Sequence, residues 1–187
     1  MQNNSVNPSD LNPYLQFDAA SGELQFENTE LSGLAQEFGT PLYVYSASSI
    51  KAAYHAYASA CQGLAQVTIC YAVKANSNIH ILKLLAQEGA GFDIVSAGEL
   101  ARVIAAGGAP EKAVFAGVGK SMQEIEYALG QGVGCFNVES EAEMERVALV
   151  AEKLQRKANV SLRVNPDVDA KTHPYISTGL KENKFGV

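Results

Sequence analysis

The sequence predicts an α/β protein whose parallel sheet is the beginning of a (β/α)8 barrel. Short apolar runs recur about every 20–25 residues, and a stretch of helical periodicity follows each of the first four. The runs cover residues 67–73, 91–95, 113–116, 135–138 and 160–164. Strand–helix repeats of this spacing require parallel strands. An open doubly wound sheet is the other closure, and we favour the barrel because no GxGxxG motif follows the first strand.

The helices between these runs carry their own start signals. Three of them open with the same Ser-x-x-Glu pattern, at Ser96 and Glu99, Ser121 and Glu124, and Ser140 and Glu143. Each pair predicts a capping box, in which the hydroxyl and the carboxylate bind main-chain N–H groups of the first helical turn. Glycines at positions 89, 107, 130 and 132 mark the expected helix ends.

The residues before the repeats predict a different local structure. Residues 1–13 are polar and are expected to be loose, and residues 15–28 predict two short strands around a Ser21-Gly22 turn. A helix over 31–38 should end at Gly39, a strand should follow over 41–46, and a helix over 48–60.

Composition excludes several classes of protein. The 187 residues carry a net charge of −6 without a cluster of Lys or Arg, which argues against nucleic acid or a membrane surface as partner. No apolar run reaches membrane-spanning length, and no positive side chain precedes Lys51, so we expect a cytoplasmic protein without a signal peptide. The three cysteines form no CxxC motif and the three histidines are scattered, so no metal site is expected.

Polar residues stand where apolar strands end, which is where barrel proteins place their chemistry. Lys74 ends the first run, and it is either a surface side chain or, if desolvated beside Val73, a nucleophilic amine. Asp93 lies inside the second run and needs a partner, structural or catalytic. Arg163, in the fifth run, fits a buried ion pair or an anion site equally well.

Two further stretches carry weaker signals. The segment "GVGK" (117–120) has the glycines of a phosphate loop without the Walker spacing. Residues 165–187 are polar and rich in turn residues, which is typical of a substrate loop or of a disordered chain end.

Five motifs in order complete the pattern: "YAVKAN", "GFDIVSAGEL", "FAGVGKS", "FNVES" and "LRVNPDVDAKTHPYISTGLKENKFG". Together they closely resemble the diaminopimelate decarboxylases, which are pyridoxal-phosphate enzymes of the alanine-racemase-like fold. The resemblance runs from about residue 42 to residue 187. The first motif alone indicates a wider group with the ornithine and arginine decarboxylases, whereas the last one is specific.

The resemblance implies roles for individual residues. Lys74 falls on the lysine that binds the cofactor aldehyde, Asp93 on the acidic residue that supports cofactor and lysine, and Arg163 on an arginine near the cofactor. The substrate loop would contain His173, Ser177, Thr178 and Lys184. The implied reaction is decarboxylation of meso-2,6-diaminopimelate to L-lysine and carbon dioxide, the last step of lysine biosynthesis.

It also implies a larger assembly. Residues 1–45 would contribute to a separate β domain and residues 46–187 would form the first part of the barrel, so we expect an N-terminal fragment of a homodimeric enzyme, inactive and poorly folded alone. Two alternatives stay open: a decarboxylase of another basic amino acid, and a non-catalytic relative that binds the cofactor or a partner.

Overall fold

A computed structural model describes residues 7–168 and 186–187 of the chain. The chain divides into two compact units, Met1–Ala60 and Cys61–Val187, and each is described by itself. The division at residues 45 and 46 that we expected from the sequence stays a prediction.

The N-terminal unit contains the predicted hairpin. Strand β1 (Leu15–Phe17) pairs antiparallel with β2 (Leu24–Phe26), and the short β3 (Thr29–Glu30) extends the sheet. Helix α2 (Leu31–Phe38) follows and ends at Gly39, whose φ of 80° lies in a region that only glycine adopts readily. The hairpin and this helix are confirmed.

Two expectations for this unit were wrong. Helix α1 (Pro8–Leu11) forms where a loose segment was expected, because the Asn7 side chain accepts a hydrogen bond from the Ser9 N–H and proline suits the first helical position. Residues 41–46 are not a strand, and Tyr43 is 85% exposed. An apolar sequence becomes a strand only where a neighbouring strand accepts its main-chain groups, and this segment has none among the described residues.

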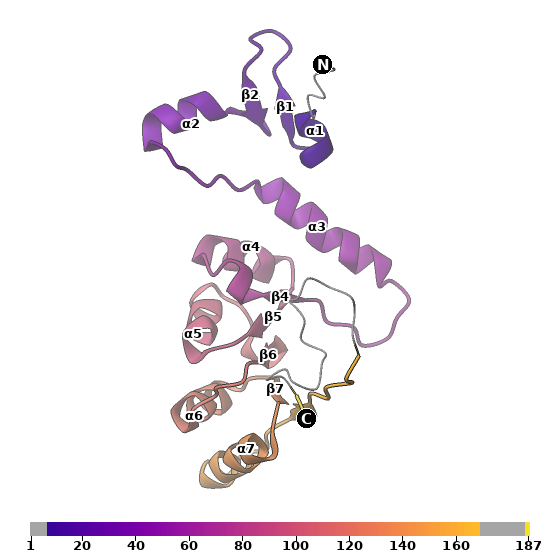
Figure 1. Cartoon of the computed structure of the whole chain (residues 1–187), viewed down its shortest axis with the longest axis vertical. Helices are drawn as coiled ribbons and strands as arrows, with labels where there is room; N and C mark the ends of the chain where they lie inside the picture. The colour runs from indigo at the N-terminus through magenta and orange to yellow at the C-terminus, as the bar shows by residue number, and fades with distance from the viewer. Residues whose placement is uncertain (1–6, 169–185) are drawn as a thin grey trace. The chain divides into compact units, whose positions relative to one another are not determined.

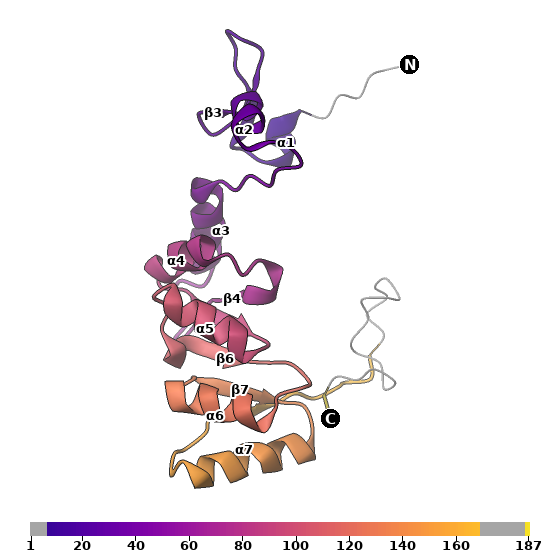
Figure 2. The same cartoon turned by 90° about the vertical axis from the view of Figure 1, so that its left-hand side faces the viewer.

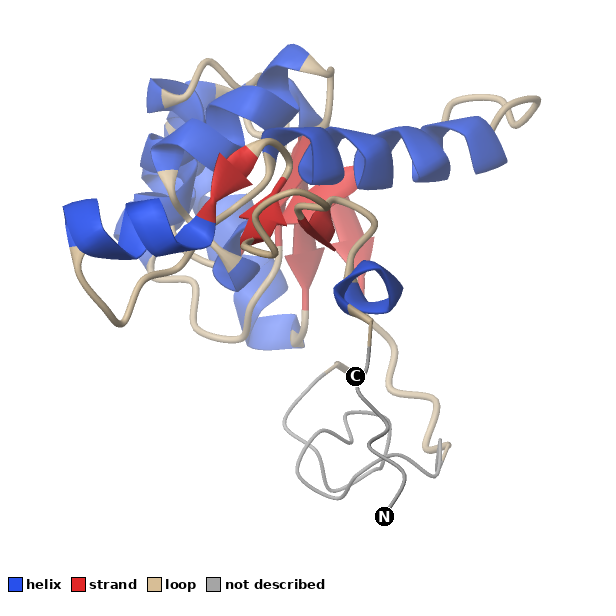
Figure 3. Ribbon diagram, turned by 90° about the horizontal axis from the view of Figure 1, so that it is seen from above, coloured by secondary structure: helices blue, strands red, loops and turns tan. Residues whose placement is uncertain are grey.

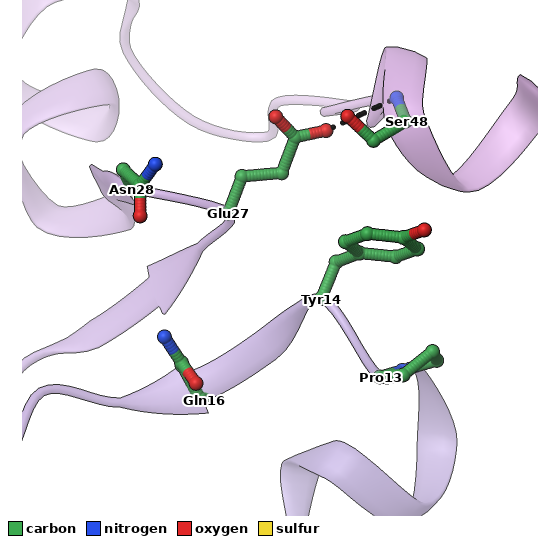
Figure 4. Close-up of a pocket in the computed structure, with 6 residues that line it drawn as sticks. All are labelled: Pro13, Tyr14, Gln16, Glu27, Asn28 and Ser48. Carbon is green, nitrogen blue, oxygen red and sulfur yellow. Dashed lines mark hydrogen bonds between the residues drawn. The ribbon is translucent and has the colours of Figure 1, made fainter.

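Glu27 joins the hairpin to the helix α3 (Ala47–Ala60). Its carboxylate accepts a hydrogen bond from the Ser46 hydroxyl. It also accepts one, at 3.2 Å, from the Ser48 N–H in the first turn of α3 (Figure 4). These bonds favour the charged carboxylate and hold the pKa of Glu27 below its ordinary value. Glu27 therefore caps α3 from a distant part of the sequence.

The second unit is a five-stranded parallel sheet with helices along one face (Figures 1 and 2). The strands lie in chain order as β4 (Cys70–Ala72), β5 (Gly91–Ile94), β6 (Ala113–Phe115), β7 (Cys135–Val138) and β8 (Val160–Leu162). The helices between them are α4 (Ile79–Gln87), α5 (Ala97–Ala105), α6 (Met122–Gln131) and α7 (Glu141–Lys153). Two short 3-10 helices, η1 (Val73–Ala75) and η2 (Pro110–Lys112), complete the unit. Each of the five predicted runs contains one strand, so the α/β class and the parallel, barrel-type sheet are confirmed.

The strands alternate between a helix-facing side and an open side. Phe92, Phe115 and Phe136 occupy the helix-facing side, are fully buried, and place their rings in the space between sheet and helices. The rings of Phe115 and Phe136 stack with centroids 5.9 Å apart. Figure 3 separates the strands from the helical layer by colour. Within the described residues, no helix is long and apolar enough to cross a membrane.

The three Ser-x-x-Glu signals all start helices, but only one is a full capping box. Each serine side chain accepts a hydrogen bond from the N–H of its glutamate. The Glu124 carboxylate accepts from the Ser121 N–H, as a capping box requires. In α5 and α7 the glutamate instead binds the N–H of the residue before the serine, Val95 or Glu139.

Of the four glycines that we expected at helix ends, three lie there and one does not. Gly89, Gly107 and Gly132 follow α4, α5 and α6 with positive φ, as expected. Gly130 instead lies inside α6, because the helix continues to Gln131.

We expect Gly134→Ala to lower the free energy of unfolding by about 1–3 kcal/mol, the usual cost of overpacking. A methyl group there would collide with the main-chain oxygen of Glu111. The matched control is Gly130→Ala, which meets nothing within 4 Å and should stabilise α6 by up to about 1 kcal/mol. Urea unfolding measures both, and equal effects from the two variants would contradict the packing argument.

Candidate active site

An open hollow of about 650 Å³ lies on the sheet side opposite the buried phenylalanines. It is lined by Cys70, Lys74, Asp93, Val114, Ala116, Asn137, Ser161 and Arg163. All five strands contribute, because parallel pairing sets Asp93 opposite Val114 and Asn137 opposite Ser161. Sequence reasoning singled out Lys74, Asp93 and Arg163, and the structure brings these three together. It missed Cys70 and Ser161, which the two-residue period of the strands would have placed on the same side.

Lys74 lies in η1, immediately after β4. The chain turns there, so that Val73 is fully buried while Lys74 is exposed. The Tyr71 hydroxyl donates to the Asn76 carbonyl at 3.2 Å and holds the two ends of the turn together. Of the two alternatives left open for Lys74, the described residues show an exposed side chain rather than a desolvated one, because the turn buries Val73 instead.

Asp93 lies in β5 and carries an unsatisfied oxygen. Its Oδ1 is buried and has no hydrogen-bond partner among the described residues. Burial raises the pKa of Asp93, and the positive charges of Lys74 and Arg163 oppose that rise. The thiol of Cys70 also has a raised pKa, first through its own burial and then through the charge of Asp93. The charges of Lys74 and Arg163 thus act on the Asp93 carboxyl across the hollow.

Arg163 follows β8 and is paired with Glu139, which follows β7. The arginine NH1 lies 3.3 Å from Oε1 of this buried carboxylate. The Gly186 N–H donates to Glu139 Oε2 at 3.3 Å, and the Val187 N–H donates to the Arg163 carbonyl at 2.9 Å. Of the two readings left open for Arg163, the ion pair is present, and its guanidinium still lines the hollow.

Lys120, the lysine of "GVGK", does not face an open phosphate site. Its side chain is fully buried and donates to the carbonyls of Gly117 and Asn137, each at 2.7 Å, and to Glu143 at 2.5 Å. No group of three or more metal-ligating side chains exists within residues 7–168 and 186–187. The expected substrate-loop residues His173, Ser177, Thr178 and Lys184 lie outside the described residues.

We expect Asp93→Asn to raise the free energy of unfolding at neutral pH. A carboxyl with a raised folded-state pKa binds its proton more tightly when folded, so stability falls as the pH rises through the window between the unfolded and folded pKa. Asparagine has no such loss. The stability difference between variant and parent should therefore be present above this window and vanish at acid pH. Urea unfolding across the pH range measures it, and a difference independent of pH would contradict the burial of a charge at Asp93.

Comparisons with known proteins agree with this geometry. The chain is 60% identical to diaminopimelate decarboxylase of Pseudomonas aeruginosa over 171 residues, which cover 91% of this chain and 41% of that relative. The structure of the Helicobacter pylori enzyme complexed with L-lysine is 51% identical with a TM-score of 0.80, covering 83% of this chain and 39% of that one. The M. jannaschii enzyme, in co-complex with L-lysine, is 38% identical with a TM-score of 0.84. The match covers 97% of this chain and 42% of that one.

The chain thus spans about two fifths of the length of the relatives that it matches. Residues 47–187 match the family described as pyridoxal-dependent decarboxylase, pyridoxal binding domain. These residues include all five strands of the parallel sheet and the whole lining of the hollow. The chain belongs to the pyridoxal-dependent decarboxylase family, whose cofactor is pyridoxal phosphate.

Proposed function

We propose that this chain carries the cofactor-binding part of an enzyme that decarboxylates meso-diaminopimelate to L-lysine and carbon dioxide. The observation that carries the proposal is the convergence of Lys74, Asp93 and Arg163 on one hollow, in a chain 60% identical to a diaminopimelate decarboxylase. The L-lysine in two related structures supports the product.

The residues of the hollow fit pyridoxal phosphate. Lys74 offers an exposed amine that an aldehyde can reach. The buried Oδ1 of Asp93 is left without a donor among the described residues, so it is available to a cationic or N–H group of a bound molecule. The volume of about 650 Å³ lies within the usual range for small-molecule sites. We propose that Lys74 binds the cofactor, and that the Asp93 carboxylate and the Arg163 guanidinium supply the charged groups around it.

The protein's part in the reaction follows from these positions. When bound, the pyridine ring of the cofactor accepts the electron pair that the departing carbon dioxide leaves behind. Lys74 would hold the cofactor through its Nζ, and the same side chain would be the group that delivers a proton to the substrate α-carbon. Asp93 lines the same hollow, and the positive charge of Lys74 lowers the pKa of this carboxyl against the rise caused by burial.

The substrate and the assembly rest on similarity. A decarboxylase of another basic amino acid would use the same lysine, so the hollow alone does not distinguish the two. The identity of 60% to a diaminopimelate decarboxylase favours the first substrate. We also propose a cytoplasmic homodimer, as the resemblance of the motifs implies. Sedimentation of the protein in the form that its source organism makes would test the dimer.

We expect Lys74→Ala, made in the whole enzyme that contains this chain, to lower kcat about 10²–10⁴-fold, the usual contribution of a positioned proton donor. It should also abolish the pyridoxyl adduct that borohydride reduction leaves on the peptide containing Lys74. Lys83→Ala, which removes an exposed lysine of α4, is the matched control and should change neither. The measurements are product formation from meso-diaminopimelate and mass mapping of the reduced protein. An adduct on another lysine would overturn the assignment of Lys74.

A further inference from the structure

A buried ion pair lies behind the hollow, next to the residues that line it. Lys120 and Glu143 are almost completely buried, with side chains 0% and 2% exposed. Removing two charges from water is costly, and apolar residues of similar size would often stabilise a protein equally well or better. The position of the pair relative to the hollow suggests a purpose beyond stability.

All three N–H donors of Lys120 are used, and each joins a different part of the frame. They reach the Gly117 carbonyl after β6, the Asn137 carbonyl in β7 and the Glu143 carboxylate in α7. The ammonium group also lies 5.6 Å from the centroid of the Phe115 ring. The Asn137 side chain lines the hollow, so Lys120 fixes the main chain of one lining residue directly.

The second carboxylate oxygen of the pair extends the contact to Arg163. Glu143 Oε2 accepts the Glu139 N–H at 3.0 Å, at the point where the chain leaves β7. The carboxylate of Glu139 in turn contacts the Arg163 guanidinium at 3.3 and 3.4 Å. A continuous series of contacts therefore leads from Lys120 through Glu143 and Glu139 to a residue of the hollow.

We propose that Lys120 and Glu143 are positioning residues, which fix Glu139 so that its carboxylate holds Arg163 at the hollow beside Asp93. This inference rests on the proposed function in that the hollow is taken as the cofactor site. Neither residue touches the hollow itself. They affect the site indirectly, by setting the orientation of the Arg163 side chain. The charge of Arg163 in turn acts on Asp93.

The decisive variant is the double substitution Lys120→Met and Glu143→Leu, which replaces the buried pair by apolar groups. Since the replacement also leaves the Gly117 and Asn137 carbonyls and the Glu139 N–H without these partners, the thermal midpoint should fall while the protein stays folded. The affinity for pyridoxal phosphate of the folded variant should also fall about tenfold, the lower end of the effect of outer-shell partners at metal sites. The single variant Glu143→Gln should weaken binding in the same direction.

A second readout does not require the cofactor. Carbon-13 NMR of the protein without pyridoxal phosphate measures the pKa of Asp93, with Asp93→Asn assigning the signal. Arg163 lowers this pKa, so releasing the guanidinium should raise it. In an Arg163→Met background the double substitution should have no further effect on the Asp93 pKa, because its influence on that pKa passes through Arg163.

The matched control is Lys153→Met, which breaks the exposed ion pair between Lys153 of α7 and Glu126 of α6. It should leave cofactor affinity and the Asp93 pKa unchanged. The proposal would be overturned if a folded double variant had the cofactor affinity and the Asp93 pKa of the parent. It would also be overturned if neither the double variant nor Glu143→Gln folded, because the pair would then serve folding alone. A whole enzyme containing this chain that binds the cofactor but forms no L-lysine would refute the proposed function, while the pKa of Asp93 would still test the positioning.

Discussion

The second unit depends on the fact that its helices cover only one side of its sheet. Strand residues alternate in direction, so every second one must fill the space under the helices with an apolar side chain. Phe92, Phe115 and Phe136 do this and are fully buried. The residues between them are free of that requirement and can be polar. Parallel pairing in register then aligns those polar positions across the sheet, which is how Asp93 and Arg163, 70 positions apart in the sequence, come to share one hollow.

The sequence predicted most of the second unit because its signals are local. The run 91–95 and β5 agree to within one residue, and the run 135–138 matches β7, since glycine or a serine cap marks their ends. Prediction failed at residues 67–69, which precede β4, and at 41–46. Strand formation needs a neighbour as well as a suitable composition. Among the described residues no strand pairs with 41–46, whereas the Ile69 carbonyl accepts the Gly91 N–H of β5 although the strand itself begins at Cys70.

The candidate site was only partly predictable for a related reason. Strand ends and motif resemblance singled out Lys74, Asp93 and Arg163, but neither indicated the partners of the charged groups. Glu139 is 24 residues from Arg163 and Glu143 is 23 from Lys120, about one strand–helix repeat in each case. Contacts at that separation form because successive strand–helix repeats pack side by side. The sequence immediately around each residue does not predict them. The capping role of Glu143 was visible, whereas its second oxygen's bond to Glu139 was not.

The chain returns to Arg163 after leaving it. Arg163 begins the segment that follows β8, yet the Val187 N–H donates to its carbonyl and the Asn165 N–H donates to the Val187 carbonyl. These hydrogen bonds fix the two flanks of residues 169–185 at one place. Loss of Val187 would therefore leave the Arg163 carbonyl and the Asn165 N–H without these partners, directly beside the residue that Glu139 pairs with at the hollow.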